Sequence, residues 1–111
     1  MAGKFEVYKD KAGEHRFRLK AGNGEIILTS QGYNEKAGCA NGIESVKKNA
    51  ANAERFEKTT TDSGKFRFNM KAGNNQVIGT SQNYSTESGR DNGIESVGRS
   101  APEAGTAEVD S

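Results

Sequence analysis

Several features that would narrow the function of a protein are missing from this sequence. Its 111 residues include one cysteine, one proline and no tryptophan, and aromatic residues make up 7%. The lone Cys39 excludes an intrachain disulfide framework and fits a reducing compartment. No apolar run approaches the roughly 18–20 residues that a membrane-spanning helix needs. Strand-like sequence begins by Phe5, which leaves no room for a signal peptide. We therefore expect a cytoplasmic protein without a membrane segment.

An excess of charge of one sign is also missing. The chain has 16 Lys and Arg against 15 Asp and Glu, a net charge of +1. This balance argues against strong non-specific binding to nucleic acid or anionic membranes. Hydrophobic residues reach only 32%, but the small net charge removes the self-repulsion that keeps disordered chains open. The composition predicts a small folded domain with a thin core.

A tandem duplication dominates the sequence. The hexapeptide Asn41–Val46 returns as Asn92–Val97, and at the same offset of 51 the ranges 4–48 and 55–99 match at 21 of 45 positions. A unit of about fifty residues buries too little surface to be stable alone, so both copies should share one core. We predict a single domain over 1–111, with repeat one at about 4–54, repeat two at about 55–101 and an acidic tail at 102–111.

Each repeat reads as three strands followed by a helix. In the first repeat, residues alternate in character over 4–9 and 15–21, and Ile26–Leu28 forms the buried part of a strand over 25–30. Gly22-Asn23-Gly24 is a hairpin turn. Apolar residues then recur every three or four positions from Ala37 to Ala50, which predicts an amphipathic helix.

The second repeat follows the same plan, with a helix over 88–101 that ends at Pro102. Asn34 is the predicted N-cap of the first helix, and Ser85 that of the second. Gly42 and Gly93 fall in mid-helix, where glycine costs about 1 kcal/mol relative to alanine. Either the helix backbone lies close to the sheet at these positions or each helix breaks at Asn-Gly.

The repeated motif is interpreted as structural, because its apolar members fall on the helix stripe. These residues are Asn41, Gly42, Ile43 and Val46 in repeat one and Asn92, Gly93, Ile94 and Val97 in repeat two.

The order of elements, together with 19–27 and 41–50, closely resembles the bacterial YegP-like family of tandem-repeat proteins over about 4–101. The resemblance implies an α+β fold with one antiparallel sheet and both helices on one face. It also implies that the strand after each helix is exchanged between halves, here 55–59 and 106–109; from its own residues the tail reads equally as an edge strand or as flexible. The family has no established activity.

No arrangement of residues predicts catalysis, a metal or a cofactor. Cys39 and His15 are single and map to Arg90 and Phe66 in the second repeat, so neither belongs to the shared design. One cysteine and one histidine cannot form a structural zinc cluster. Glu44 and Glu95 could pair across the repeat axis as an acid–base site, but exposed helix flanks explain them better.

The open face of the sheet is the best candidate for binding. Alternation places on it the residues Tyr8, Arg16, Arg18, Lys20, Arg67 and Lys71. Basic sheets with aromatic residues bind single-stranded RNA in some modules, although those carry several stacking aromatics. The duplicated Thr29–Gln31 and Thr80–Gln82 either line a groove between the strand end and the helix start, or terminate the third strand and anchor the helix entry through side-chain hydrogen bonds to the backbone. We favour the second.

The sequence alone does not assign a biochemical function. We expect a non-enzymatic interaction or scaffold module, with a protein partner on the sheet face or at the outer strands. Weak single-stranded nucleic-acid binding through the basic face is the alternative, and an enzyme with a site at the repeat interface is the second alternative. The oligomeric state cannot be read, because internal duplication replaces dimerisation in some folds while exposed outer strands still pair in others.

Overall fold

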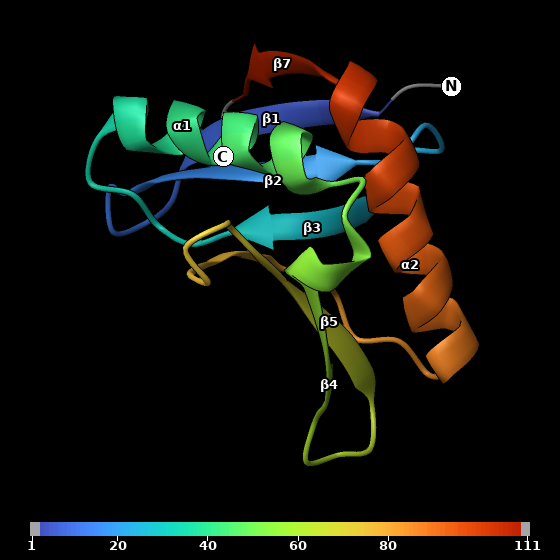
Figure 1. Ribbon diagram of the computed structural model, residues 1–111. Helices are drawn as coiled ribbons and strands as arrows, with labels where there is room; N and C mark the ends of the chain where they lie inside the picture. Colours follow the sequence, from blue (N-terminus) through green and yellow to red (C-terminus); the bar gives the residue numbers. More distant parts are fainter. Residues whose placement is uncertain (1–2, 110–111) are drawn as a thin grey trace.

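The computed structural model describes residues 3–109, which form seven strands, two helices and two short 3-10 turns (Figure 1). The first repeat supplies β1 (Lys4–Lys9), β2 (His15–Lys20), β3 (Ile26–Ser30) and α1 (Lys36–Asn49). After the turn η1 (Ala53–Arg55), the second supplies β4 (Phe56–Thr60), β5 (Phe66–Lys71), β6 (Val77–Thr80) and α2 (Glu87–Ser100). The turn η2 (Ala101–Glu103) and β7 (Gly105–Glu108) complete the chain.

All seven strands belong to one sheet in the order β4-β5-β6-β3-β2-β1-β7. Within each repeat the strands form an antiparallel meander, and the repeats join where β3 pairs with β6, Thr29 opposite Thr80. The α+β fold with two repeats in one sheet is as predicted. The seventh strand runs parallel to β1, with Lys4 opposite Gly105, so the complete sheet is mixed rather than wholly antiparallel.

Both predicted exchanged strands exist. β4 follows α1 but pairs with β5 of the second repeat, and β7 follows α2 but pairs with β1 of the first. Figure 1 shows β7 beside β1 at one end of the sheet, while the β4–β5 hairpin extends away at the other end. The acidic tail is therefore ordered as an edge strand as far as Glu108.

One core lies between the helices and one face of the sheet. Its members come from both repeats and include matched aromatic pairs. The fully buried Phe5 and Phe17 have ring centroids 5.7 Å apart at 71°, and the partly buried Phe56 lies 5.7 Å from the buried Phe68 at 69°. Edge-to-face contacts of this kind add stabilisation beyond area burial. The near-identical geometry shows that this aromatic contact is repeated in both halves.

The prediction that Ile26 is buried is wrong. Ile27 and Leu28 are buried, but Ile26 is 38% exposed. The ladder between β2 and β3 shifts here, with Leu19 opposite Leu28 and Lys20 opposite Ile26. The extra residue of this bulge breaks the alternation, so Ile27 and Leu28 are both buried and Ile26, which precedes them, emerges on the open face.

Both helices run unbroken through their central glycines. A Cβ at Gly42 would lie 2.6 Å from Tyr33 Oη and 2.9 Å from Phe17, and one at Gly93 would lie 2.4 Å from Tyr84 Oη. Close helix–sheet approach, the first of the two alternatives, therefore accounts for these glycines.

The N-cap predictions are each wrong by one residue. Glu35 precedes α1 and makes no side-chain cap, whereas Thr86 caps α2 by accepting the Gly89 N–H at 3.0 Å. Asn34 and Ser85 stand one position before these caps. Only at Thr86 does a hydroxyl reach a free amide of the first turn.

Candidate functional site

Most of the basic side chains on the open face are already held by acids. Glu6 Oε1 accepts a hydrogen bond from Arg18 Nε at 2.8 Å and lies 3.3 Å from Lys20 Nζ. Arg16 Nε donates to Asp10 Oδ2 at 2.6 Å, and in the second repeat Lys71 Nζ lies 3.1 Å from Glu57. Of the five predicted basic residues, only Arg67 makes no ion pair within residues 3–109. This face is therefore a charge-balanced network rather than a positive surface.

The one aromatic side chain of this predicted face is covered. The Arg18 guanidinium lies 4.9 Å from the centroid of the Tyr8 ring. A cation over the ring occupies the face on which a base would stack. The structure thus brings Tyr8, Arg18 and Lys20 together around Glu6, with the Arg18 guanidinium over one face of the Tyr8 ring.

The same ion pairs lower the pKa of the acids. The hydrogen bond from Arg18 is the main cause that lowers the pKa of Glu6, with Lys20 adding to it against the cost of burial. Arg16 is the main cause that lowers the pKa of Asp10, and Asp10 in turn raises the pKa of Arg16. Both carboxylates are thereby held in the ionised form.

A hollow of about 570 Å³ lies on the seam between the repeats. Its lining is nearly symmetric, because four identical pairs at offset 51 contribute to it: Arg16 and Arg67, Thr29 and Thr80, Ser30 and Ser81, and Gln31 and Gln82. The remaining lining residues are Ile26 and Gly32. The lining has no carboxylate, imidazole or thiol, so it offers neither a general base nor an activated nucleophile.

The two serines of this hollow have structural roles. Ser30 Oγ accepts the Phe17 N–H at 2.9 Å and donates to the Gln31 carbonyl at 2.8 Å. Ser81 makes the same bonds to Phe68 and Gln82 at 2.9 and 2.8 Å. The favoured interpretation, side-chain hydrogen bonds to the backbone, holds for both serines. The hollow that these segments line lies on the seam and has no helix residue in its lining, so it is not the predicted groove between strand end and helix start.

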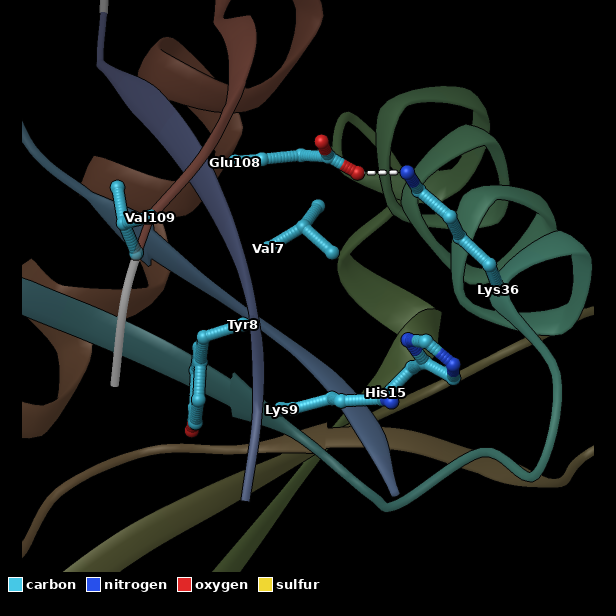
Figure 2. A pocket seen from close by; sticks show the side chains of 7 residues that line it. All are labelled: Val7, Tyr8, Lys9, His15, Lys36, Glu108 and Val109. Atoms are coloured by element: carbon cyan, nitrogen blue, oxygen red, sulfur yellow. Dashed lines mark ion pairs between the residues drawn. The ribbon is translucent and has the colours of Figure 1, made fainter. Parts of the chain in front are cut away.

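A second hollow of about 330 Å³ lies where β7, β1 and α1 meet (Figure 2). Lys36 at the start of α1 forms an ion pair with Glu108 of β7, while Val7 and His15 lie on the α1 side of β1 and Tyr8 points to the other side. Cys39 is not part of the lining, and burial raises the pKa of its thiol. His15 and Cys39 therefore do not form a nucleophile–base pair in this hollow.

The second repeat has Arg90 and Phe66 where the first has Cys39 and His15. Arg90 is only 8% exposed, and its guanidinium lies 5.4 Å from the Phe66 ring centroid. Both replacements were noted from the sequence, but this contact was not predicted. The two replacements occur together: between the repeats Cys39 becomes Arg90 and His15 becomes Phe66. A cation that appears together with a new aromatic ring is the sequence pattern that could have predicted the contact.

The two edges of the sheet differ. On the β1 edge, β7 is paired over four positions and the Val109 N–H donates to the Val7 carbonyl at 2.9 Å. On the β4 edge, no strand among residues 3–109 is paired. The backbone N–H and C=O of Phe66 bond to Tyr84, and the Phe68 carbonyl accepts the Ser81 N–H, so the backbone groups of these two β5 residues point away from β4. In an antiparallel pair, the β4 residues opposite them then direct their own backbone N–H and C=O groups away from β5, towards the open edge. These outward-facing residues are Phe56, Lys58 and Thr60.

Comparison with known proteins places this architecture in a family. The profile of the domain of unknown function DUF1508 matches residues 10–57 and again residues 62–108. The UPF0339 protein in the ptx operon 5′ region of Stutzerimonas stutzeri is 60% identical over 109 residues, which cover 98% of each chain. This chain belongs to the UPF0339 family, whose members include YegP.

The UPF0339 fold is also known from solved structures. The solution NMR structure of the protein of unknown function YegP from Escherichia coli aligns with a TM-score of 0.94 at 46% identity, covering 99% of this chain and 95% of that one. The UPF0339 protein SO3888 from Shewanella oneidensis aligns with a TM-score of 0.92 at 44% identity, covering 99% and 93%. The predicted YegP-like resemblance is confirmed, and the relatives remain uncharacterised, so the site must be argued from this chain.

The remaining candidates of this UPF0339 chain do not assemble into sites. Glu44 and Glu95 are both exposed, and Glu95 lies 4.0 Å from Arg99 one helical turn on. Over residues 3–109, no three His, Cys, Asp or Glu side chains gather as a metal site would require. Within the same range, neither helix has the length and apolar character to cross a membrane.

Proposed function

We propose that this protein is a non-enzymatic interaction module of the cytoplasm that binds an extended segment of a partner protein along the free edge of β4. Strand addition to an exposed sheet edge is a general mode of peptide recognition, in which main-chain hydrogen bonds supply affinity. The seam hollow has no carboxylate, imidazole or thiol in its lining, and Cys39 is not among the residues that line the second hollow, which supports a binding role. The buried free Cys39 fits a reducing compartment.

The observation that carries the proposal is the difference between two equivalent edges. β1 and β4 occupy matching places in the two repeats. Within residues 3–109, β7 pairs with the outer edge of β1, whereas the outer edge of β4 is unpaired. The covered edge shows that this fold accepts a parallel strand there. Lys58 stands at the position of Val7, whose carbonyl receives the bond from β7, so its outward carbonyl offers the same acceptor to a partner.

The charge at the open edge indicates what partner fits. At the covered edge Lys36 pairs with the acidic Glu108 of β7. Its counterpart at the start of α2 is the exposed Glu87, which makes no ion pair within residues 3–109. The partner segment should therefore have small residues, as β7 has, with a basic side chain at the position of Glu108.

A second copy of this chain fits the edge less well. The longest antiparallel overlap of β4 with itself is centred on Lys58, which would place two lysines directly opposite each other. A lysine in the middle of an edge strand is a common protection against self-pairing. In parallel addition of a foreign segment, the residue at the position of Glu108 also falls opposite Lys58. By analogy with Lys36 and Glu108 it lies within reach of Glu87, and Lys58 is itself paired with Asp91 at 3.1 Å.

Titration of the 15N-labelled full chain with two peptides tests the proposal. One peptide has the sequence of residues 104–109, Ala-Gly-Thr-Ala-Glu-Val, and the other has Lys in place of Glu. We expect saturable NMR shifts at the amides of Phe56, Lys58 and Thr60 with the Lys peptide, at roughly millimolar affinity because a short strand loses much entropy on binding. The Glu peptide should bind several-fold more weakly.

Two variants separate backbone pairing from charge. Lys58→Pro removes an outward N–H without breaking the β4–β5 ladder, and we expect it to abolish the shifts; Thr60→Pro serves if that variant is unstable. Lys58→Ala keeps the N–H and should still bind. Absence of β4 shifts with both peptides, or binding that survives both proline variants, would refute strand addition.

A further inference from the structure

The seam hollow has a second feature beside its symmetric lining. Ile26, the large hydrophobic residue that is exposed among residues 3–109, lies in this hollow at 38% exposure. Two arginines and no carboxylate stand around it. A concave site of this size that combines an apolar wall with a few polar groups is typical of small-molecule binding.

The two arginines of the hollow have different surroundings. Arg16 is fixed, since its Nε donates to Asp10 at 2.6 Å and its Nη1 donates to the Ser30 carbonyl at 3.1 Å. In the second repeat the position of Asp10 is taken by Thr61, yet the arginine is retained as Arg67. An ion pair with that acid therefore does not explain why both repeats have an arginine here.

Arg67 is left with an uncompensated charge. It makes no ion pair and no side-chain hydrogen bond within residues 3–109, while Asp10 balances Arg16 on the opposite side. A guanidinium offers parallel N–H donors that match a carboxylate in two-point contact. Elsewhere in the lining, the Gln31 side chain is held by a 2.6 Å bond to the Val77 carbonyl, so part of the wall is preorganised.

We propose that the seam hollow binds a small organic acid, with the carboxylate on Arg67 and the apolar body against Ile26. The hollow lies on the open face at the joint of β3 and β6, away from the β4 edge. This binding is therefore independent of strand addition, and either can hold without the other. The threonine pair, Thr29 and Thr80, forms the floor of the site at the repeat axis.

Benzoate is the test ligand, followed by 1H–15N NMR on the full chain. We expect saturable shifts centred on Thr29, Arg67 and Thr80. Arg67→Gln should weaken binding about tenfold, because it removes the charge and the two-point contact. The matched control is Arg99→Gln, which makes the same charge change at an arginine that is 75% exposed on α2 and outside the hollow; it should bind benzoate like the wild type.

Three further measurements define the ligand class. Benzyl alcohol, which lacks the carboxylate, should bind several-fold more weakly than benzoate, and Ile26→Ser should weaken benzoate binding. Inorganic phosphate that binds as tightly as benzoate would overturn the organic-acid assignment. No saturable shift with benzoate, or equal affinity in the wild type and Arg67→Gln, would overturn the site itself.

Discussion

At the scale of single residues, Glu6 is the most constrained charge of the open face. It is 7% exposed and is surrounded by Arg18 at 2.8 Å, Lys20 at 3.3 Å and Lys4 at 4.0 Å. A buried carboxylate is stable only when such partners offset its lost hydration. Its ionisation should therefore be coupled to folding.

This coupling predicts a specific pH dependence. Arg18 lowers the pKa of Glu6 in the folded state below its ordinary value of 4.5. The stabilisation is then fully present above that ordinary pKa and is lost as the pH falls through the lower folded pKa. We expect Glu6→Gln to be less stable than the wild type in urea unfolding at about pH 6, with the two curves converging towards about pH 3.

Glu44→Gln is the control, since it removes one carboxylate from an exposed position of α1. It should follow the wild-type curve over the whole range. A constant difference between Glu6→Gln and the wild type would show that packing, rather than ionisation, accounts for the loss.

At the scale of elements, the sequence was sufficient for the periodic segments and insufficient where long-range contacts decide. Alternation identified β2 and β5, and the three-to-four spacing identified both helices. Periodicity could not foresee the bulge that exposes Ile26, because a bulge depends on the partner strand. It also could not show which acids pair with which basic residues of the predicted face, since Asp10 and Glu6 come from outside β2.

The parallel strand β7 has an ion pair to α1 in addition to its backbone ladder with β1. The first turn of α1 has no acid, and Glu108 brings one to Lys36 at that helix start. Both side chains are largely exposed, at 62% and 64%, so the pair should contribute less than about 1 kcal/mol. Its effect should be local, on how often β7 detaches.

Hydrogen exchange of the Val109 amide, which bonds to Val7, measures this detachment. We expect Glu108→Lys to speed exchange up to about fivefold, because two lysines then face each other. The double variant Lys36→Glu/Glu108→Lys should restore slow exchange, and high salt should reduce all the differences. Unchanged exchange in Glu108→Lys would show that the backbone ladder alone holds β7.

At the scale of the whole molecule, the repeats are similar but not interchangeable. The axis that relates them passes between Thr29 and Thr80, and beside it Leu28 of one repeat occupies the position of Gly79 in the other. A Cβ at Gly79 would lie 2.8 to 3.0 Å from three carbon atoms of Leu28. The missing side chain on one side thus makes room for the leucine of the other.

This large–small pair predicts a reciprocal rescue. Leu28→Gly should lower the free energy of unfolding by roughly 3–5 kcal/mol through the cavity it leaves and the added backbone freedom. Gly79→Leu should lower it by at least about 1–3 kcal/mol through overpacking. The double variant Leu28→Gly/Gly79→Leu moves the leucine across the axis, so by symmetry it should regain a large part of the loss in urea denaturation. Losses that simply add would mean that the surroundings of the axis, and not the pair itself, distinguish the two repeats.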